Sequence, residues 1–183
     1  MKIDSLIFTT GNEDKLREAQ EILKVPLKGT LLRIEEIQSL DLVRVATSKA
    51  REYYRILRKP LFVEDVSLSF EALNGLPGTY INDFYKAIGN NGLVKLISGR
   101  NRKAIAKVAI VYIDKSGEVH TFIGEVEGEI AKKAKGKNGF GWDAIFIPKG
   151  EKITFAEMTL QEKNKHSMRK KALISFSRWI SSV

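Results

Sequence analysis

The chain has 183 residues, of which 43% are hydrophobic, so it is long enough to bury one well-formed core. Its 31 lysines and arginines outnumber 22 acidic residues and give a formal net charge of +9, which favours an anionic partner such as nucleic acid, a membrane surface or a polyphosphate. The absence of cysteine excludes disulfides and thiolate metal sites, and two histidines are too few for a histidine-rich zinc site.

The N-terminal part predicts a strand, a polar turn and a helix. An apolar run at 5–10 suits a buried strand. Asn12 is a favourable helix cap, and Glu13 and Asp14 occupy the first turn, where acidic residues stabilise a helix. A second strand is predicted over 29–34. The apolar residues of the helix recur at helical spacing: Leu16, Ala19, Ile22 and Leu23.

The next part alternates between helix and strand. A long helix is predicted over 42–57, ending before Pro60, and a strand over 61–70. A turn-rich loop then leads to two helical pieces around 82–88 and 91–98.

The C-terminal half is predicted to begin with a long antiparallel hairpin. Its strands cover 102–114 and 118–131, with Lys115-Ser116-Gly117 as the turn. A glycine-rich loop at 135–150 runs into a short strand, and 167–182 forms an amphipathic helix. Strands and helices interleave on both sides of the hairpin, which indicates an α/β fold with a mixed sheet. The apolar face of the last helix carries Leu173, Phe176 and Ile180.

The chain shows no repeat, low-complexity tract or flexible linker, so one domain over 1–183 is expected. The apolar run at its start is too short for a signal peptide, and no stretch approaches membrane-spanning length. We therefore expect a cytoplasmic protein with no membrane partner.

The turn after the first predicted strand contains Thr10, Gly11 and Asn12, followed by Lys15 in the helix. Glycine lets the backbone approach an anion closely, and the free N–H groups of a helix start can bind a phosphate. The alternative is an ordinary capped helix. A Walker A motif is absent, so both readings stay open.

Two adjacent carboxylates, Glu64 and Asp65, follow the apolar run at 61–63 and are expected at the end of a strand, where their side chains must point in opposite directions. Such an acid could hold a hard cation or activate a water, or the pair could belong to an exposed strand end. Glu36 and Lys49, taken alone, are a surface acid and a solvated helix lysine.

The glycine-rich loop carries Phe140 and Trp142, followed at once by Asp143. An exposed aromatic ring could stack on a nucleobase, and a carboxylate could accept hydrogen bonds from base N–H groups. The alternative is that both rings anchor the loop in the core. A further polar group precedes the last helix and contains Lys163, Asn164, Ser167 and Arg169.

The order of these motifs resembles the inosine triphosphate pyrophosphatase (Ham1-like) family. The resemblance covers residue 8 to about residue 173 and follows the motifs T-G-N-x-x-K, E-I-Q, E-D, G-L-P-G-x-Y-I, G-F-G-W-D, T-F-A-E-M and E-K-N-x-x-S-x-R. It implies an elongated, curved mixed sheet flanked by helices, with two lobes and a central substrate cleft. It also implies one nucleoside triphosphate pyrophosphatase domain and a homodimer.

The activity implied by the resemblance is Mg²⁺-dependent hydrolysis of ITP, XTP and dITP to the monophosphate and pyrophosphate. Asp65 would be the general base, and Glu36 and Asp65 would hold the metal. Lys163 and Arg169 would complete the pocket for the base, and Glu18 is a further candidate for the same pocket. The residues implied to contact substrate are Thr10, Gly11, Asn12, Lys15, Lys49, Val66, Phe140, Gly141, Trp142, Asp143, Lys163, Met168 and Arg169.

Two of these positions depart from the family pattern. The family usually has Ser-His-Arg where this chain has Ser167, Met168 and Arg169, and that histidine contacts the 6-oxo edge of the purine. Val66 replaces a residue that is commonly Ser or Thr, so a hydroxyl contact is missing or comes from Ser67. We expect hydrolysis to be retained with altered base selectivity.

Two other functions remain as alternatives. A Maf-like nucleotide pyrophosphatase of other specificity is disfavoured by the G-F-G-W-D and E-K-N segments. A basic single-strand nucleic-acid binder would interleave basic and aromatic residues on one sheet face. Here the aromatics gather in one loop and the hairpin strands are apolar. That reading also leaves Glu36, Glu64 and Asp65 unexplained, so no stable nucleic-acid partner is expected.

Overall fold

The computed structural model describes residues 6–30 and 32–182. Ser5 and Leu31, which fall in predicted strands, lie outside the described residues. The chain divides into two compact units. Unit 1 takes the residues up to Asp65, Val108–Gly124 and those from Arg169 onward, and unit 2 takes Val66–Lys107 and Glu125–Met168.

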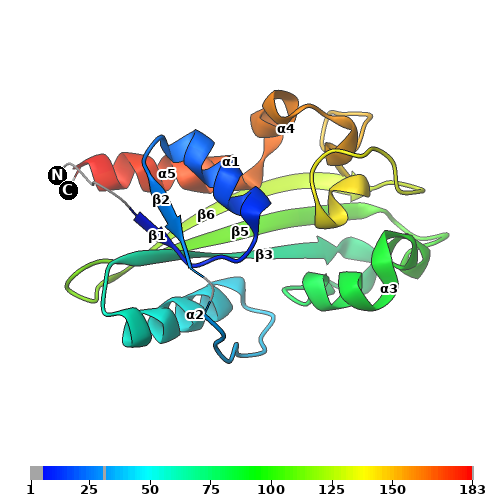
Figure 1. The fold of residues 1–183 in the computed structure, drawn as a ribbon. Helices are drawn as coiled ribbons and strands as arrows, with labels where there is room; N and C mark the ends of the chain where they lie inside the picture. The colour runs from blue at the N-terminus through cyan, green and yellow to red at the C-terminus, as the bar shows by residue number, and fades with distance from the viewer. Residues whose placement is uncertain (1–5, 31, 183) are drawn as a thin grey trace. The chain divides into compact units, whose positions relative to one another are not determined.

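Among the described residues, seven strands form one mixed sheet in the order β2-β1-β3-β5-β6-β7, with β4 paired to β3 (Figure 1). The strands are β1 (Leu6–Phe8), β2 (Leu27–Gly29), β3 (Leu61–Phe70), β4 (Pro77–Gly78), β5 (Lys103–Ile113), β6 (Val119–Ile130) and β7 (Phe146–Pro148). β1 runs parallel to β2 and β3, whereas β4 and β7 pair antiparallel with β3 and β6. This confirms the predicted α/β fold with a mixed sheet.

Five α-helices and three short 3₁₀ helices are described with the sheet. The α-helices are α1 (Glu13–Leu23), α2 (Leu42–Leu57), α3 (Ile81–Leu96), α4 (Leu160–His166) and α5 (Met168–Ser182). The 3₁₀ helices are η1 (Glu71–Leu73), η2 (Gly141–Ala144) and η3 (Phe155–Glu157). None of the described helices is long and apolar enough to span a bilayer.

In unit 1, α1 and α5 lie on one face of the sheet and α2 on the other (Figure 1). Side chains of β3 alternate between these faces, as a strand requires. Leu61 and Val63 belong to the core formed with α2. Phe62 points the opposite way. The centre of its ring lies 4.4 Å from the ring centre of Phe8 and 5.3 Å from that of Phe176 in α5. The alternation places successive residues of β3 in two different environments.

The bounds of α2 and β3 agree with the prediction, and the predicted hairpin is confirmed. The amide of Asp114 donates to Glu118 O at one end of the hairpin, and the amide of Ile130 donates to Arg102 O at the other, which is an antiparallel register. The two predicted helical pieces are joined in α3, where Gly89 has non-helical angles of φ 63 and ψ −178.

The strand predicted over 29–34 is wrong. The strand is Leu27–Gly29 and ends level with Phe8, the last residue of β1, so a longer strand would have no neighbour to pair with. Leu32 and Ile34 pack on the α2 side of the core instead, and Leu32 O accepts a hydrogen bond of 2.9 Å from the Tyr53 hydroxyl.

Unit 2 has its own aromatic core next to β7. The ring centre of Phe146 lies 5.7 Å from that of Trp142 and 5.3 Å from that of Phe155. Trp142 is only 6% exposed, so this ring anchors the glycine-rich loop. The alternative reading of that loop is therefore correct for Trp142, whereas Phe140 is only partly buried.

Candidate active site

The turn at Thr10–Asn12 links β1 to α1 and is held by its own side chains. Asn12 Oδ1 accepts a hydrogen bond of 3.0 Å from the Lys15 amide, which confirms the predicted cap. Thr10 Oγ1 accepts one of 3.1 Å from the Asn12 amide. Gly11 is exposed. The turn thus presents the positive end of α1 at the surface of unit 1, which is compatible with an anion and with a plain cap.

A buried group of four charges lies on the α1 and α5 face of β3. We call it the Glu64 cluster, and it comprises Lys15, Glu18, Glu64 and Arg169. Arg169 binds Glu64 in a bidentate ion pair, with Nε–Oε2 at 2.7 Å and Nη2–Oε1 at 2.9 Å. Its Nη1 also donates to Glu18. Lys15 Nζ lies 3.2 Å from Glu64 Oε1. The two negative and the two positive charges of the cluster therefore balance.

The cluster keeps Glu64 ionised although the residue is almost fully buried. Burial alone would raise the pKa of Glu64, but the charges and hydrogen bonds of Arg169 and Lys15 outweigh it and lower the pKa to about 2. Both cations therefore face a permanent negative charge, which fixes the ammonium of Lys15 beside the turn at Thr10–Asn12.

A second group of charges lies on the α2 side of β3. It comprises Glu36, Lys49 and Asp65, and we call it the Asp65 cluster. Lys49 Nζ lies 2.8 Å from Glu36 Oε1 and 3.5 Å from Asp65 Oδ2. Burial would lower the pKa of Lys49, but Asp65 and Glu36 raise it overall. The two carboxylates thus converge on one cation, and hard oxygen donors of this kind suit Mg²⁺.

The two clusters occupy opposite faces of β3, as the alternation of Glu64 and Asp65 predicts. β1 stops at Phe8, which pairs with Phe62, so β1 does not cover the edge of β3 at Val63–Asp65. Ligands of parallel strands bind where such strands end. Glu64 and Asp65 thus lie within β3 beside the end of β1 and are buried, so they do not belong to an exposed strand end.

In unit 2, the glycine-rich loop surrounds the carboxylate of Asp143. Asp143 Oδ2 accepts a hydrogen bond of 2.9 Å from the Phe140 amide and one of 2.7 Å from Lys163 Nζ. The same ammonium lies 5.1 Å from the centre of the Phe140 ring. Gly139 has φ 71, and a Cβ there would lie 2.2 Å from Asp143 Oδ2, so glycine is needed. Asp143 therefore holds the loop from inside.

The predicted site residues therefore fall into two sets. Unit 1 brings together the turn with Lys15, the Asp65 cluster and Arg169, and unit 2 brings together Phe140–Asp143 and Lys163. Arg169, which the resemblance assigns to the base pocket, lies in the Glu64 cluster together with Glu18. Val66 and Met168 are buried in unit 2, at 5% and 4% exposure.

Among the described residues, His166 lies two positions before Met168, where the family has its histidine, and forms an ion pair with an acidic residue. Its Nε2 lies 2.9 Å from Glu151 Oε1. The His166 ring therefore contacts an acidic residue that follows β7 in unit 2.

Sequence reasoning predicted neither the ion pairs of Glu64 nor any role for Asn90. Glu64 carries an acidic signal next to Asp65, but its role depends on Arg169, 105 residues away. Asn90 Nδ2 donates a hydrogen bond of 3.0 Å to Gly141 O in the glycine-rich loop. No local pattern could have identified this contact, since it joins residues 51 positions apart.

One more group of metal-type ligands exists among the described residues, at the hairpin turn: Asp114, Glu118 and His120. Asp114 Oδ1 already accepts hydrogen bonds from the amide and hydroxyl of Ser116 and from the Glu118 amide. The ring of His120 packs against that of Trp179 in a tilted arrangement, with ring centres 4.1 Å apart. These hydrogen bonds explain why the three side chains lie close together at the turn, without a metal ion.

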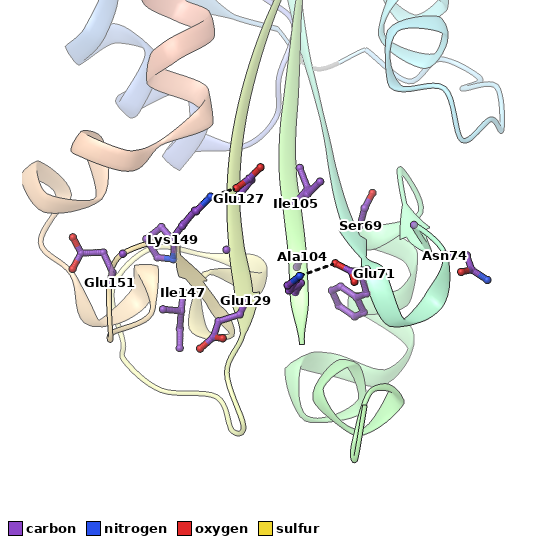
Figure 2. A pocket seen from close by; sticks show the side chains of 16 residues that line it. Ser69, Glu71, Asn74, Ala104, Ile105, Glu127, Glu129, Ile147, Lys149 and Glu151 are labelled. Atoms are coloured by element: carbon purple, nitrogen blue, oxygen red, sulfur yellow. Dashed lines mark hydrogen bonds and ion pairs between the residues drawn. The ribbon is translucent and has the colours of Figure 1, made fainter. Parts of the chain in front are cut away.

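An open pocket of about 880 Å³ lies in unit 2 over β3, β5, β6 and β7 (Figure 2). Glu127 Oε2 is 2.6 Å from Lys149 Nζ, and Glu71 Oε2 is 3.9 Å from Lys103 Nζ. None of the site residues predicted from the sequence lines this pocket. Its volume therefore does not mark the chemistry described above.

Comparisons with known proteins agree in one family. A model of the Ham1 family matches residues 6–179. The dITP/XTP pyrophosphatase of Methanopyrus kandleri is 43% identical to this chain over 178 residues, and the match covers 95% of both chains. The dITP/XTP pyrophosphatase of Thermococcus kodakarensis is 44% identical over 179 residues, with 96% of both chains covered.

A eukaryotic relative and a solved structure extend the similarity. Inosine triphosphate pyrophosphatase 2 of Trypanosoma cruzi is 41% identical over 172 residues, which is 92% of this chain and 88% of the relative. The structure of a HAM1 protein from Coxiella burnetii superimposes with a TM-score of 0.86 at 28% identity, covering 99% of this chain and all of that one.

Proposed function

Because the chain belongs to the Ham1 family, we propose that it hydrolyses non-standard purine nucleoside triphosphates (ITP, XTP and dITP) to the monophosphate and pyrophosphate, and so removes them from the nucleotide pool. The observation that carries the proposal is the similarity to relatives named dITP/XTP pyrophosphatase and inosine triphosphate pyrophosphatase over nearly the whole chain. The chemistry of the site residues supports it.

The phosphate end of the substrate is assigned to unit 1. Lys15 and Lys49 supply positive charge, and the exposed turn at Thr10–Asn12 supplies backbone N–H groups at a helix start. A triphosphate carries several negative charges, and neutralising them in the pentacoordinate transition state is the main task of such a site. The net charge of +9 favours capture of the same anion.

Asp65 is assigned as the general base. Residue Asp65 is 8% exposed, and its Oδ2 lies 3.5 Å from Lys49 Nζ. In this role it takes a proton from the water that attacks the α-phosphorus. No covalent nucleophile is needed, which suits a chain without cysteine.

Glu36 and Asp65 are the residues that would hold Mg²⁺, since their oxygens already converge on one cation, the ammonium of Lys49. A bound Mg²⁺ supplies charge neutralisation on the phosphate oxygens. Lys49 holds the two carboxylates at this spacing and contributes its own charge to the same end of the substrate.

The base end is assigned to the glycine-rich loop of unit 2. Phe140 is partly buried and offers its ring for stacking, and Gly141 and Trp142 complete the loop. Asp143 and Lys163 form an ion pair of 2.7 Å that offers both an acceptor and a donor to a purine. Met168 and Arg169 take the positions where the family reads the base, and Val66 follows the proposed general base.

The remaining expectations follow from the family. We propose a homodimer located in the cytoplasm, with residues 1–183 acting as one pyrophosphatase domain. Two lobes around a central substrate cleft are part of the same proposal.

The proposal is tested by measuring the products from ITP, XTP, dITP, ATP, GTP, CTP and UTP with and without Mg²⁺. Pyrophosphate and monophosphate are expected from ITP, XTP and dITP in the presence of Mg²⁺, and not after chelation with EDTA. Orthophosphate as the product would mean attack at the γ-phosphorus and would contradict the proposed mechanism.

A further inference from the structure

Asn90 lies directly after the break in α3. Gly89 leaves the helical region there, and the helix resumes with Asn90. Gly92 packs against the preceding segment so closely that a Cβ on it would lie 2.5 Å from Ile88 Cβ. The two helical segments therefore fix the position from which the Asn90 side chain projects.

An asparagine at the start of a helix ordinarily caps it, with Oδ1 accepting from a backbone amide. Asn90 does not act in this way. Within residues 6–30 and 32–182, its Oδ1 is buried and has no hydrogen-bond partner. Its Nδ2 instead donates to Gly141 O at 3.0 Å. Only the amide nitrogen can donate to a carbonyl, so the contact requires this residue type in this orientation.

The contact adds to the other hydrogen bonds that hold this loop, among them those of Lys137 and Asn138 to Ala156 O. Asp143 binds the Phe140 amide from inside the loop, and Lys163 binds Asp143 from α4. Gly141 has φ 60, and a Cβ there would lie in open space. The hydrogen bond from Asn90 Nδ2 restrains the Gly141 carbonyl, one residue after Phe140.

Leaving a buried acceptor unpaired costs folding free energy. An alanine at position 90 would bury no such acceptor. What the asparagine gains is the hydrogen bond to Gly141 O, which holds the loop assigned to the base. Accepting a cost in folding free energy for such a contact is expected at a functional position.

We propose that Asn90 is a positioning residue for base recognition, which acts by holding Gly141 and, through it, the ring of Phe140. The inference rests on the proposed function and names a further residue of the same site. Asn90 touches no reacting atom, so its loss acts on binding of the nucleoside and not on the phosphate end.

The test compares Asn90→Ala and Asn90→Asp with Asn91→Ala, a neighbouring exposed asparagine as the matched control. Asp keeps the shape of the side chain but cannot donate to a carbonyl when ionised. Both Asn90 variants are expected to raise KM for ITP about three- to tenfold, the effect of one hydrogen bond, with kcat within about twofold of wild type. Asn91→Ala is expected to leave both constants unchanged.

Two further measurements separate positioning from a general structural role. The inhibition constant of tripolyphosphate, which has no base, should not change in Asn90→Ala, and Tm should stay equal or rise. Amide hydrogen exchange at 139–143 should become faster in this variant without any substrate.

Unchanged KM and unchanged exchange would overturn the inference. Weaker tripolyphosphate inhibition together with a lower Tm would also overturn it, since that combination indicates a structural role only. If wild type releases no pyrophosphate from ITP, the proposed function fails, and the exchange measurement alone then decides whether Asn90 holds the loop.

Discussion

Glu64 and Arg169 lie 105 residues apart in the chain and meet in a bidentate ion pair, with Nε–Oε2 at 2.7 Å and Nη2–Oε1 at 2.9 Å. Both side chains are nearly inaccessible to solvent. Lys15 shares the same carboxylate, so the ammonium proposed to contact the triphosphate is positioned by a residue that is itself fixed by the C-terminal helix. Several predictions about stability and activity depend on this geometry.

Stability should depend on pH through Glu64. Its pKa falls from an ordinary value of 4.5 to about 2 on folding, so its contribution is fully present above about pH 4.5 and is lost as the pH falls toward 2. Glu64→Gln removes the carboxylate that Arg169 and Lys15 share, although Arg169 keeps its ion pair with Glu18, and should lower the free energy of unfolding at pH 7 by about 3 kcal/mol. Urea unfolding at pH 7, 5, 4 and 3 should show this difference narrowing below pH 4.5.

Glu21→Gln, at an exposed position of α1, is the control for that series and should follow wild type at every pH. A difference between wild type and Glu64→Gln that stays constant from pH 7 to pH 3 would mean that folding does not lower the pKa of Glu64.

Asp65→Asn should retain the fold and lower kcat by about 10²-fold or more, the effect of losing a positioned general base. The amide keeps the size of the side chain but cannot accept a proton from water. The measurement is pyrophosphate release from ITP at saturating Mg²⁺, with Asp83→Asn, an exposed acid of α3, as the control. Near-normal turnover would transfer the role of base to another group.

Lys15→Ala should raise KM for the triphosphate and also lower kcat, because its charge meets the phosphates in both the ground state and the transition state. Lys28→Ala removes the same charge from an exposed position of β2 and should leave both constants near wild type. Equal effects in the two variants would indicate that only the net charge of the protein matters.

Met168→His should raise the ratio of kcat/KM for ITP to that for ATP. A thioether is only a weak acceptor and has no N–H donor, whereas imidazole can bind the 6-oxo group. One neutral hydrogen bond changes kcat/KM by a few-fold to about tenfold. Met168 is 4% exposed, so circular dichroism must first show that the variant folds. An unchanged ratio in the folded variant would remove this residue from base recognition.

Local pattern was sufficient for the elements that are long and strongly periodic. The bounds of α2 and β3 agree with the prediction because a 16-residue helix and a 10-residue apolar strand carry their own signals. The strand predicted over 29–34 failed for a non-local reason. Strand length depends on the partner, and β1 ends at Phe8.

The site shows the same division. The turn at Thr10–Asn12 and the loop around Phe140 could be found from sequence because each is a contiguous motif. The role of Arg169 could not, because its contacts with Glu18 and Glu64 join three elements that are distant in the chain. Asn90 looks like an ordinary helix residue until the carbonyl of Gly141 is seen beside its Nδ2.

The discontinuity of unit 1 has a consequence for biosynthesis. Unit 2 is complete once Met168 has left the ribosome, whereas unit 1 still lacks the helix that begins there and carries Arg169. Until that helix emerges, Glu64 has no guanidinium to compensate its burial, so the first 65 residues cannot reach their final packing. The nascent chain is therefore expected to fold its inserted unit first and its N-terminal unit last, against the usual N-to-C order of synthesis.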